Sequence, residues 1–296
     1  IFMPSYIEQI SSLGPKIWYR FNETAGTPVN YGSLSTTSTF TDLLLNEQTD
    51  VDGRAVYFNG SSSYIELPAH PAFSVFNDKS FTVECWVKIA TADTGTSTPL
   101  EIFRLNAPSS PHYNISLTVG GTTANRGKLI QDSTWNGGAQ LISPMRIDNG
   151  VWTHVAITIN TQYWILYVNG VAQTAITPAN PPASFNFDES SKKLIGAGYV
   201  GIAQTTKGQY FKGRIDEFAV YDRALTDAEL LANFNIGASV TFTSGVIGTA
   251  SALMVQPTIS ASFNPAAQAP MTASAVLANV EVSNFDDVNG IQKIIS

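Results

Sequence analysis

The sequence predicts an all-β protein, an antiparallel sandwich of two sheets with short flanking helices and an extended β-rich arm at its C-terminal end. The first observation behind this is composition. The 296 residues include 22 glycines and 15 prolines, and only 13% are charged, which is typical of many short strands joined by turns. The second is a series of short apolar stretches with turn residues between them. The third is a strand that runs into a capped helix at residues 213–230.

The N-terminal part of the chain begins with a short predicted helix. Apolar residues recur at helical spacing over residues 5–13, and Gly14-Pro15 ends the helix. An aromatic strand follows at residues 17–23. A pair of strands is predicted within residues 55–66, interrupted by the turn Asn59-Gly60-Ser61.

The middle of the chain is predicted to form strands only. The apolar stretches lie at residues 81–89, 100–105, 113–119 and 128–132. Two further stretches, residues 151–159 and 164–170, are predicted to pair as a hairpin. The single cysteine, Cys85, shares one face of its strand with Phe81 and Val83, so we expect a buried, inert thiol. One cysteine also excludes an internal disulfide and a cysteine-based metal cluster.

The strand and helix near residue 220 are the most informative local pattern. Residues 213–221 alternate with a period of two, which predicts a strand with side chains on both faces. Thr226 and Glu229 then have the spacing of a capping box ahead of apolar Leu230, which predicts that a helix begins there. Gly237 follows the last apolar residue of the helical pattern and predicts where that helix ends.

This strand-and-helix block resembles the closing strand and short helix of laminin-G-like jelly rolls, in the concanavalin A-like lectin superfamily. A Trp152-x-His154 strand followed by one that closes in Val168-Asn169-Gly170 is similar to the same family, as is the aromatic first strand leading to Glu23 and Gly26. The resemblance covers about residues 14–237. It implies a jelly-roll sandwich of the kind used for adhesion and sugar recognition.

Three regions are therefore predicted: a short helix at residues 1–14, the jelly-roll domain at residues 15–237, and a low-charge arm at residues 238–296. The formal net charge of −7 disfavours a nucleic-acid partner or an anionic membrane surface. No stretch approaches the roughly 20 apolar residues that cross a bilayer, so we expect no membrane insertion.

Residues 238–296 differ in composition from the rest of the chain. Glu281 is their only charged residue before Phe285, and residues 249–255 are repeated imperfectly at residues 272–278. Apolar, β-prone stretches of this kind need partners, which predicts an assembly arm that packs against other subunits. The repeat also resembles segments in the minor tail proteins of phages that infect actinobacteria. A disordered low-complexity linker is the alternative.

The pattern of carboxylates argues against catalysis. Retaining glucanases of this superfamily carry a Glu-x-Asp-x-x-Glu arrangement that places two carboxylates about 5 Å apart on one face. No such spacing occurs here, and Asp216 and Glu217 are adjacent, so a regular strand would point them to opposite faces. The histidines, His70, His112 and His154, lie outside any triad-like motif. We expect no enzyme.

The resemblance implies one structural Ca²⁺ where the exit of the first strand meets the Ile-Asp-Glu strand. Asp216 and Glu23 would be its ligands, because Ca²⁺ requires hard oxygen donors. The family's usual Asp-Ser-x-Gly turn appears here as Asn30-Tyr31-Gly32-Ser33, which removes a carboxylate. The alternative is that Asp216 caps a loop or pairs with Arg20 or Arg214.

A sugar site needs an aromatic face beside amide or hydroxyl groups. The glycine-rich loop with Trp135 and Asn136 offers both. The other residues expected near this site are Tyr113, Asn114, Tyr199 and Tyr210. The alternative is that Trp135 only covers a sheet edge. We expect Trp135→Ala to abolish glycan binding without altering thermal stability.

Taken together, these features predict a non-enzymatic, carbohydrate-binding adhesion domain of a phage tail protein, located in the virion and directed at the host cell envelope. Its partners would be an envelope glycan or polymer and other tail subunits, contacted through residues 238–296 in a homo-oligomeric assembly. One alternative is a carbohydrate-binding module of a secreted bacterial hydrolase or surface protein. The other is a purely structural virion component.

Overall fold

The computed structural model describes most of the predicted jelly-roll region. The described residues are 4–49, 51–68, 80–95, 98–106, 114–132, 140–160, 162–176, 192–200, 206–238, 242–243 and 249–250. The chain divides into two units, Ile1–Ala252 and Leu253–Ser296, and the second unit lies outside the described residues. The predicted assembly role of residues 238–296 therefore stays a prediction.

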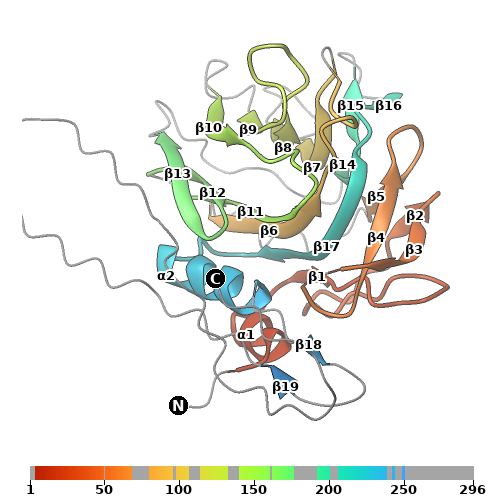
Figure 1. Cartoon of the computed structure of the whole chain (residues 1–296), viewed down its shortest axis with the longest axis vertical. Helices are drawn as coiled ribbons and strands as arrows, with labels where there is room; N and C mark the ends of the chain where they lie inside the picture. Colours follow the sequence, from red (N-terminus) through yellow and green to blue (C-terminus); the bar gives the residue numbers. More distant parts are fainter. Residues whose placement is uncertain are drawn as a thin grey trace, which may run out of the picture. The chain divides into compact units, whose positions relative to one another are not determined.

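Two antiparallel sheets form the body of the domain (Figure 1). The first has the order β13 (Val171–Ile176), β12 (Trp164–Val168), β11 (Trp152–Ile159), β6 (Phe81–Lys88), β17 (Lys212–Tyr221), β4 (Arg54–Asn59) and β3 (Leu44–Gln48), with β1 (Ile17–Tyr19) paired to β17. The second has the order β10 (Leu141–Arg146), β9 (Lys128–Asp132), β8 (Asn114–Val119), β7 (Leu100–Asn106), β14 (Lys192–Ile195), β5 (Tyr64–Leu67) and β2 (Thr39–Thr41). Two small ribbons pair β15 (Gly198–Val200) with β16 (Thr206–Gly208), and β18 (Phe242–Thr243) with β19 (Thr249–Ala250). The predicted all-β sandwich is confirmed.

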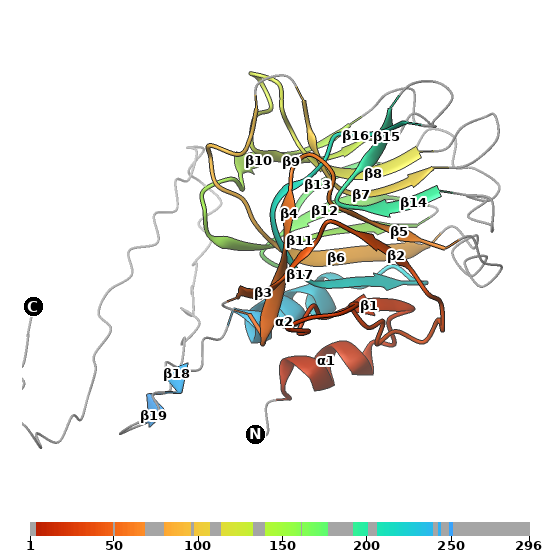
Figure 2. The same cartoon turned by 90° about the vertical axis from the view of Figure 1, so that its right-hand side faces the viewer.

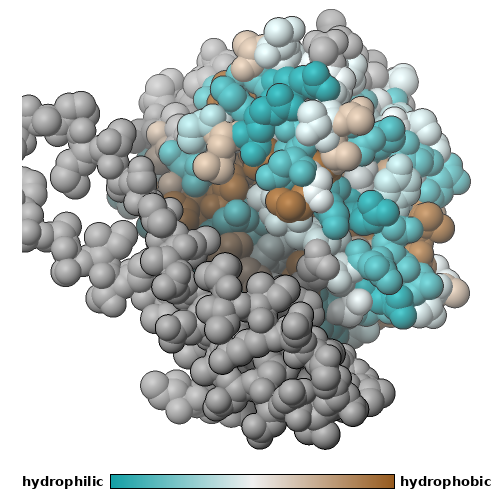
Figure 3. All heavy atoms as spheres, in the orientation of Figure 1, coloured by the Kyte–Doolittle hydropathy of each residue, from teal (hydrophilic) through white to brown (hydrophobic). Residues whose placement is uncertain are grey.

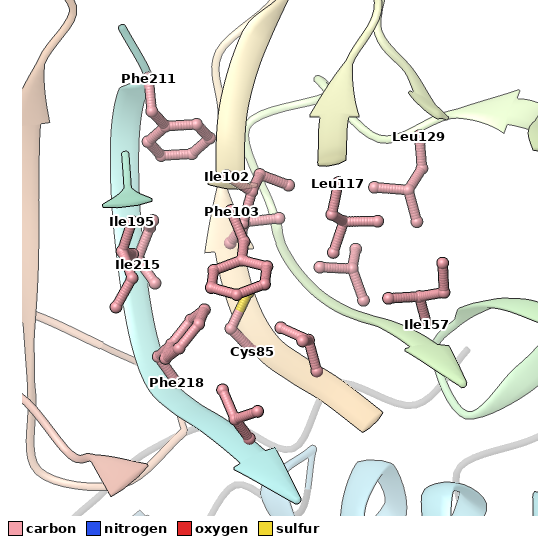
Figure 4. Close-up of a cluster of buried hydrophobic side chains, with 14 of the residues drawn as sticks. Cys85, Ile102, Phe103, Leu117, Leu129, Ile157, Ile195, Phe211, Ile215 and Phe218 are labelled. Carbon is pink, nitrogen blue, oxygen red and sulfur yellow. The ribbon is translucent and has the colours of Figure 1, made fainter. Parts of the chain in front are cut away.

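The main core lies between the two sheets (Figure 4). Side chains that alternate along each strand point inward from both sheets, as the period of two predicts. Phe103 of β7 and Phe218 of β17 meet across the sandwich with their ring centroids 5.6 Å apart. Cys85 is buried among them with a free thiol, as expected, and burial raises the pKa of that thiol well above its usual value.

Helices α1 (Tyr6–Ser12) and α2 (Asp227–Gly237) cover the outer face of the eight-stranded sheet (Figures 1 and 2). Both begin with a capping box, one made by Ser5 and Glu8 and the other by the predicted pair Thr226 and Glu229. A second apolar cluster forms under them, so the central strands of this sheet are buried on both faces. Neither described helix is long and apolar enough to cross a membrane.

The predicted strand pair within residues 55–66 turns out to join the two sheets. β4 belongs to the eight-stranded sheet and β5 to the seven-stranded sheet. Asn59 makes the connection, because its Oδ1 accepts hydrogen bonds from the backbone N–H groups of Ser61, Ser62 and Ser63. Gly60 adopts a φ of 79°, a left-handed conformation that glycine tolerates. The turn was predicted correctly, but its strands are not a hairpin.

β17 departs from the regular alternation that its sequence predicts. Its register against β6 shifts between Asp216 and Ala219, and Glu217 has a φ of 49°. This bulge changes the phase of the strand, so that Ile215, Phe218 and Val220 share the main core. The expectation that Asp216 and Glu217 point to opposite faces and stay apart is wrong, because the bulge brings the two carboxyl groups into electrostatic contact.

Candidate ligand-binding site

The outer face of the seven-stranded sheet carries a row of polar side chains. On β5, Ile65 and Leu67 point into the core, so Glu66 points outward. Glu66 pairs in register with Leu194 of β14, Leu194 with Arg104 of β7, and Arg104 with Ser116 of β8. The antiparallel register thus aligns side chains from four strands across one face.

Three tyrosines gather at one end of this row. Tyr199 of the small β15–β16 ribbon is buried with Leu194, and partly buried Tyr64 and Tyr210 pack against them. The ammonium group of Lys207, from β16, lies 4.5 Å from the ring centroid of Tyr64 and 5.6 Å from that of Tyr199. We call these four residues, Tyr64, Tyr199, Lys207 and Tyr210, the tyrosine cluster.

Hydrogen bonds and ion pairs hold the tyrosine cluster against the polar row. Glu66 accepts a hydrogen bond from the Tyr199 hydroxyl at 3.2 Å and forms an ion pair with Lys207 at 3.1 Å. Burial raises the pKa of Tyr199, and the nearby Glu66 carboxylate raises it further, so the phenol stays protonated and acts as a donor. Farther along the row, Arg104 lies 3.4 Å from Glu101. Aromatic rings beside fixed hydrogen-bonding groups are the chemistry that a sugar requires.

The structure brings two of the predicted sugar-site residues together, Tyr199 and Tyr210. Asn114 is the first residue of β8 and pairs with Asn106 on the same sheet, although its side chain lies outside the description. Tyr113, Trp135 and Asn136 lie outside the described residues, so their part in the site stays a prediction.

The structure adds Tyr64, Glu66, Arg104 and Lys207 to the candidate site. The period-two alternation of Tyr64 and Glu66 with core residues was a usable signal for their outward direction. The sequence does not predict that Tyr64 and Glu66 lie close to Lys207, because this contact depends on how the short ribbon of β15 and β16 packs.

The two predicted calcium ligands each have partners within the protein. Asp216 is fully buried, and its carboxyl oxygens accept hydrogen bonds from the Thr49 hydroxyl at 2.6 Å and the Glu217 backbone N–H at 2.8 Å. Glu23 accepts a hydrogen bond from the Val29 backbone N–H at 3.0 Å, while its Oε2 is buried without a hydrogen-bond partner. Within the described ranges, no three His, Cys, Asp or Glu side chains are grouped so that they could hold a metal ion.

Calcium at this position stays a prediction with a direct test. If Glu23 and Asp216 bind Ca²⁺, adding the ion to chelator-treated protein should raise the Tm, because a ligand that binds only the folded state stabilises it. Calorimetry measures this effect, and an equal Tm with chelator and with excess Ca²⁺ would contradict the prediction that this domain binds calcium.

The two arginines expected as alternative partners of Asp216 pair with other carboxylates. Arg20 pairs with Asp52 at 2.7 Å and with Glu217 at 3.4 Å, and Arg214 pairs with Glu47. Glu217 accepts a further hydrogen bond from the Trp18 indole N–H at 2.6 Å. The bulge in β17 thus places two carboxyl groups in a closed, hydrogen-bonded environment.

Burial changes the ionisation of this carboxyl pair. Desolvation raises the pKa of Glu217 to about 8, against the opposing effect of Arg20. Desolvation and the charge of Glu217 also raise the pKa of Asp216 well above its usual value. Raised carboxyl pKa values occur at catalytic sites, but both side chains are buried beneath protein partners and have no open face for a substrate.

The other buried polar network surrounds Glu84 under the helices. Its carboxylate accepts hydrogen bonds from the Tyr221 hydroxyl at 2.5 Å and from the Asn233 amide at 2.9 Å, and lies 3.0 Å from His154 Nε2. Asn233 also accepts a hydrogen bond from Gln9 of α1. His154 is therefore a structural histidine, as expected, and the network ties both helices to the sheet.

Comparisons with known proteins agree with this architecture. Residues 59–231 match the Laminin_G_3 family, described as the concanavalin A-like lectin/glucanases superfamily. A comparison with curated protein sequences finds no match.

Solved structures with this fold include three from binding domains or sugar complexes. The receptor-binding domain of botulinum neurotoxin C/D mosaic serotype aligns with a TM-score of 0.56 and 13% identity, over 75% of this chain and 51% of that chain. The binding domain of Paraclostridial Mosquitocidal Protein 1 aligns at 0.55 and 17%, over 75% and 52%. This chain therefore spans about half the length of these two structures.

The third structure is domain 4 of AbnA, a GH43 extracellular arabinanase from Geobacillus stearothermophilus, in complex with arabinotriose. It aligns with a TM-score of 0.53 and 23% identity, over 75% of this chain and 98% of that one. These similarities concern the fold. Because the family match spans more than half of the sequence, the chain belongs to the Laminin_G_3 family of the concanavalin A-like lectin/glucanases superfamily.

Proposed function

We propose that this chain is a non-enzymatic glycan-binding domain of a phage tail protein that recognises the host cell envelope. The observation that carries the proposal is the tyrosine cluster beside the polar row on the outer face of the seven-stranded sheet. Partly exposed Tyr64 and Tyr210 offer aromatic faces for a sugar ring, while Glu66 and Arg104 supply groups for its hydroxyls.

The chemistry of this face favours binding over catalysis. Glu66 forms an ion pair with Lys207 at 3.1 Å and accepts a hydrogen bond from the Tyr199 hydroxyl at 3.2 Å, so its oxygens have partners within the protein. The carboxyl groups with raised pKa values, Asp216 and Glu217, are buried at a different place, in β17. On the face of the molecule shown in Figure 3, most described residues are hydrophilic, and a hydrophobic area lies at the left beside the grey residues.

The similar structures support a binding role, and two of them were solved with sugars. Domain 4 of the arabinanase was solved with arabinotriose, and a botulinum neurotoxin serotype D ligand-binding domain was solved with N-acetylneuraminic acid. The setting in a phage tail rests on residues 238–296, whose low charge and repeat resemble phage minor tail proteins. Several copies on one particle would convert weak sugar contacts into avid attachment.

Binding to isolated cell walls tests this function. We expect the purified chain to sediment with walls of an actinobacterial host and to be released by a soluble fragment of the same envelope polymer. A chain that stays in the supernatant with every envelope fraction would favour the alternative of a purely structural virion component. A catalytic or wall-anchoring domain elsewhere in the parent protein would favour a module of a secreted hydrolase or surface protein.

A further inference from the structure

An open polar cavity lies at the edge of the eight-stranded sheet, whereas the tyrosine cluster lies on the seven-stranded sheet. The cavity has a volume of about 450 Å³ and is lined by Asn22, Gln48, Thr49, Gly53 and Arg54. Gln48 ends β3 and pairs in register with Arg54 at the start of β4, so the cavity lies at the hairpin that joins these strands (Figure 1). Its volume is within the range of small-molecule sites.

The described residues on both sides of this turn are held by contacts within the protein. Gly53 has a φ of 79°, and an added Cβ would collide with the side chain of Asn22. The Oδ1 of Asn22 accepts a hydrogen bond from the Arg54 backbone N–H at 2.5 Å. Thr49 donates to Asp216 and accepts from the Val51 backbone N–H at 3.1 Å. The walls of the cavity are therefore preorganised, which lowers the entropic cost of binding.

The groups that remain for a ligand are mainly donors. The oxygen of Asn22 is used within the protein, which leaves its Nδ2 amide group, and Gln48 is exposed with its whole amide. The Arg54 guanidinium makes no hydrogen bond or ion pair with any part of the chain that the structure describes. A guanidinium has five N–H donors in a planar fork that fits a carboxylate in a bidentate manner.

In the described part of the chain, the charged groups near the cavity have partners other than Arg54. Arg20 is already paired with Asp52 at 2.7 Å, and Glu47 with Arg214 at 2.7 Å. Beneath Thr49, desolvation raises the pKa of Asp216 well above its usual value, which favours the neutral acid. Among the residues that the structure describes, Arg54 is thus a cation without an acidic partner in a cavity lined by hydroxyl and amide groups, which matches a ligand with one negative charge and several hydroxyl groups.

We propose that this cavity is a second saccharide site, which takes a carboxylate-bearing sugar, with the carboxylate on Arg54 and the hydroxyls on Asn22 and Gln48. Inorganic phosphate carries more negative charge than one guanidinium balances and is too small to reach Asn22 and Gln48 with several hydroxyl groups at once, so it should bind more weakly. The site is on the other sheet from the tyrosine cluster, so it can fail or succeed independently of the proposed function.

The test is a titration of the full chain with glucuronate, galacturonate and N-acetylneuraminate, followed by NMR or calorimetry, with glucose and inorganic phosphate as comparison ligands. We expect at least one of the three acidic sugars to bind, and to bind about tenfold more tightly than either comparison ligand. Arg54→Gln should weaken that binding by about tenfold or more, and Gln48→Ala by less, because it removes only a neutral amide.

Matched variants separate a local effect from a change in net charge or in folding. Lys128→Gln removes the same charge on β9 of the other sheet and should leave the affinity unchanged. Tyr163→Ala, in the connection between β11 and β12, should also leave acidic-sugar binding intact. The proposal is overturned if none of the three acidic sugars binds at millimolar concentration. It is also overturned if Arg54→Gln and Lys128→Gln bind the acidic sugar with equal affinity.

Discussion

Replacing Glu84 with leucine should destabilise the domain by about 3–5 kcal/mol, the largest effect we expect from any single substitution in the structure. Glu84 is 1% exposed, and its carboxylate makes hydrogen bonds with the Tyr221 hydroxyl, the Asn233 amide and His154 Nε2. Leucine would leave these groups buried without an acceptor, and an unsatisfied buried polar group costs about 1–3 kcal/mol. Urea unfolding followed by circular dichroism measures the loss as a lower midpoint.

Tyr221→Phe is the matched comparison for Glu84→Leu. It removes one donor from the same network and keeps the packing of the ring, so its cost should be about 1 kcal/mol. Because the two residues share a hydrogen bond, the double variant should lose less than the sum of the single losses. Equal, small losses for Glu84→Leu and Tyr221→Phe would show that the network does not hold the helices in place.

The stability of the domain should fall as the pH rises from 5 to 8, and Glu217→Gln should flatten that slope. The folded-state pKa of Glu217 is raised by desolvation to about 8 from a usual value of 4.5. Between these two values the unfolded chain releases the Glu217 proton and the folded protein keeps it, so ionisation favours unfolding. The slope from this group can reach about 1.4 kcal/mol per pH unit, and Asp216 acts in the same direction.

Glutamine resembles the protonated acid, so Glu217→Gln should match the parent protein near pH 5 and exceed its stability near pH 8. Glu229→Gln is the control of opposite sign. Hydrogen bonds donated by Arg223 lower the pKa of the Glu229 carboxyl group to about 2. The contribution of Glu229 to folding stability is therefore present above pH 4.5 and is lost only as the pH falls toward 2. Urea midpoints at several pH values would contradict this account if Glu217→Gln kept the parental slope between pH 5 and 8.

The sandwich could be predicted because strand periodicity and capping are local signals. The predicted strand at residues 128–132 is β9, and the Thr226 capping box begins α2 as expected. β10 was not predicted, because Pro144 argues against a strand and only its position at the sheet edge permits it. β15 and β16 have three residues each, which is too short for a period to appear.

The candidate site was harder to predict, because tertiary contacts define it. Tyr199 and Tyr210 were selected as aromatic residues near a loop, but Tyr64 was read only as part of a strand. The bulge at Glu217 left no mark on the alternation of residues 213–221, yet it creates the buried carboxyl pair. Such features follow from how strands pack, which a linear pattern does not contain.

The central claim, that sugar binds at the tyrosine cluster, is tested most directly on a glycan array with paired tyrosine variants. We expect the parent chain and Tyr163→Ala to bind the same glycans, because Tyr163 is 44% exposed in the connection between β11 and β12 of the other sheet. Tyr64→Ala should lose binding to those glycans while its Tm stays close to that of the parent, since Tyr64 is only partly buried. Undiminished binding by Tyr64→Ala would place the sugar elsewhere on the domain and contradict the account.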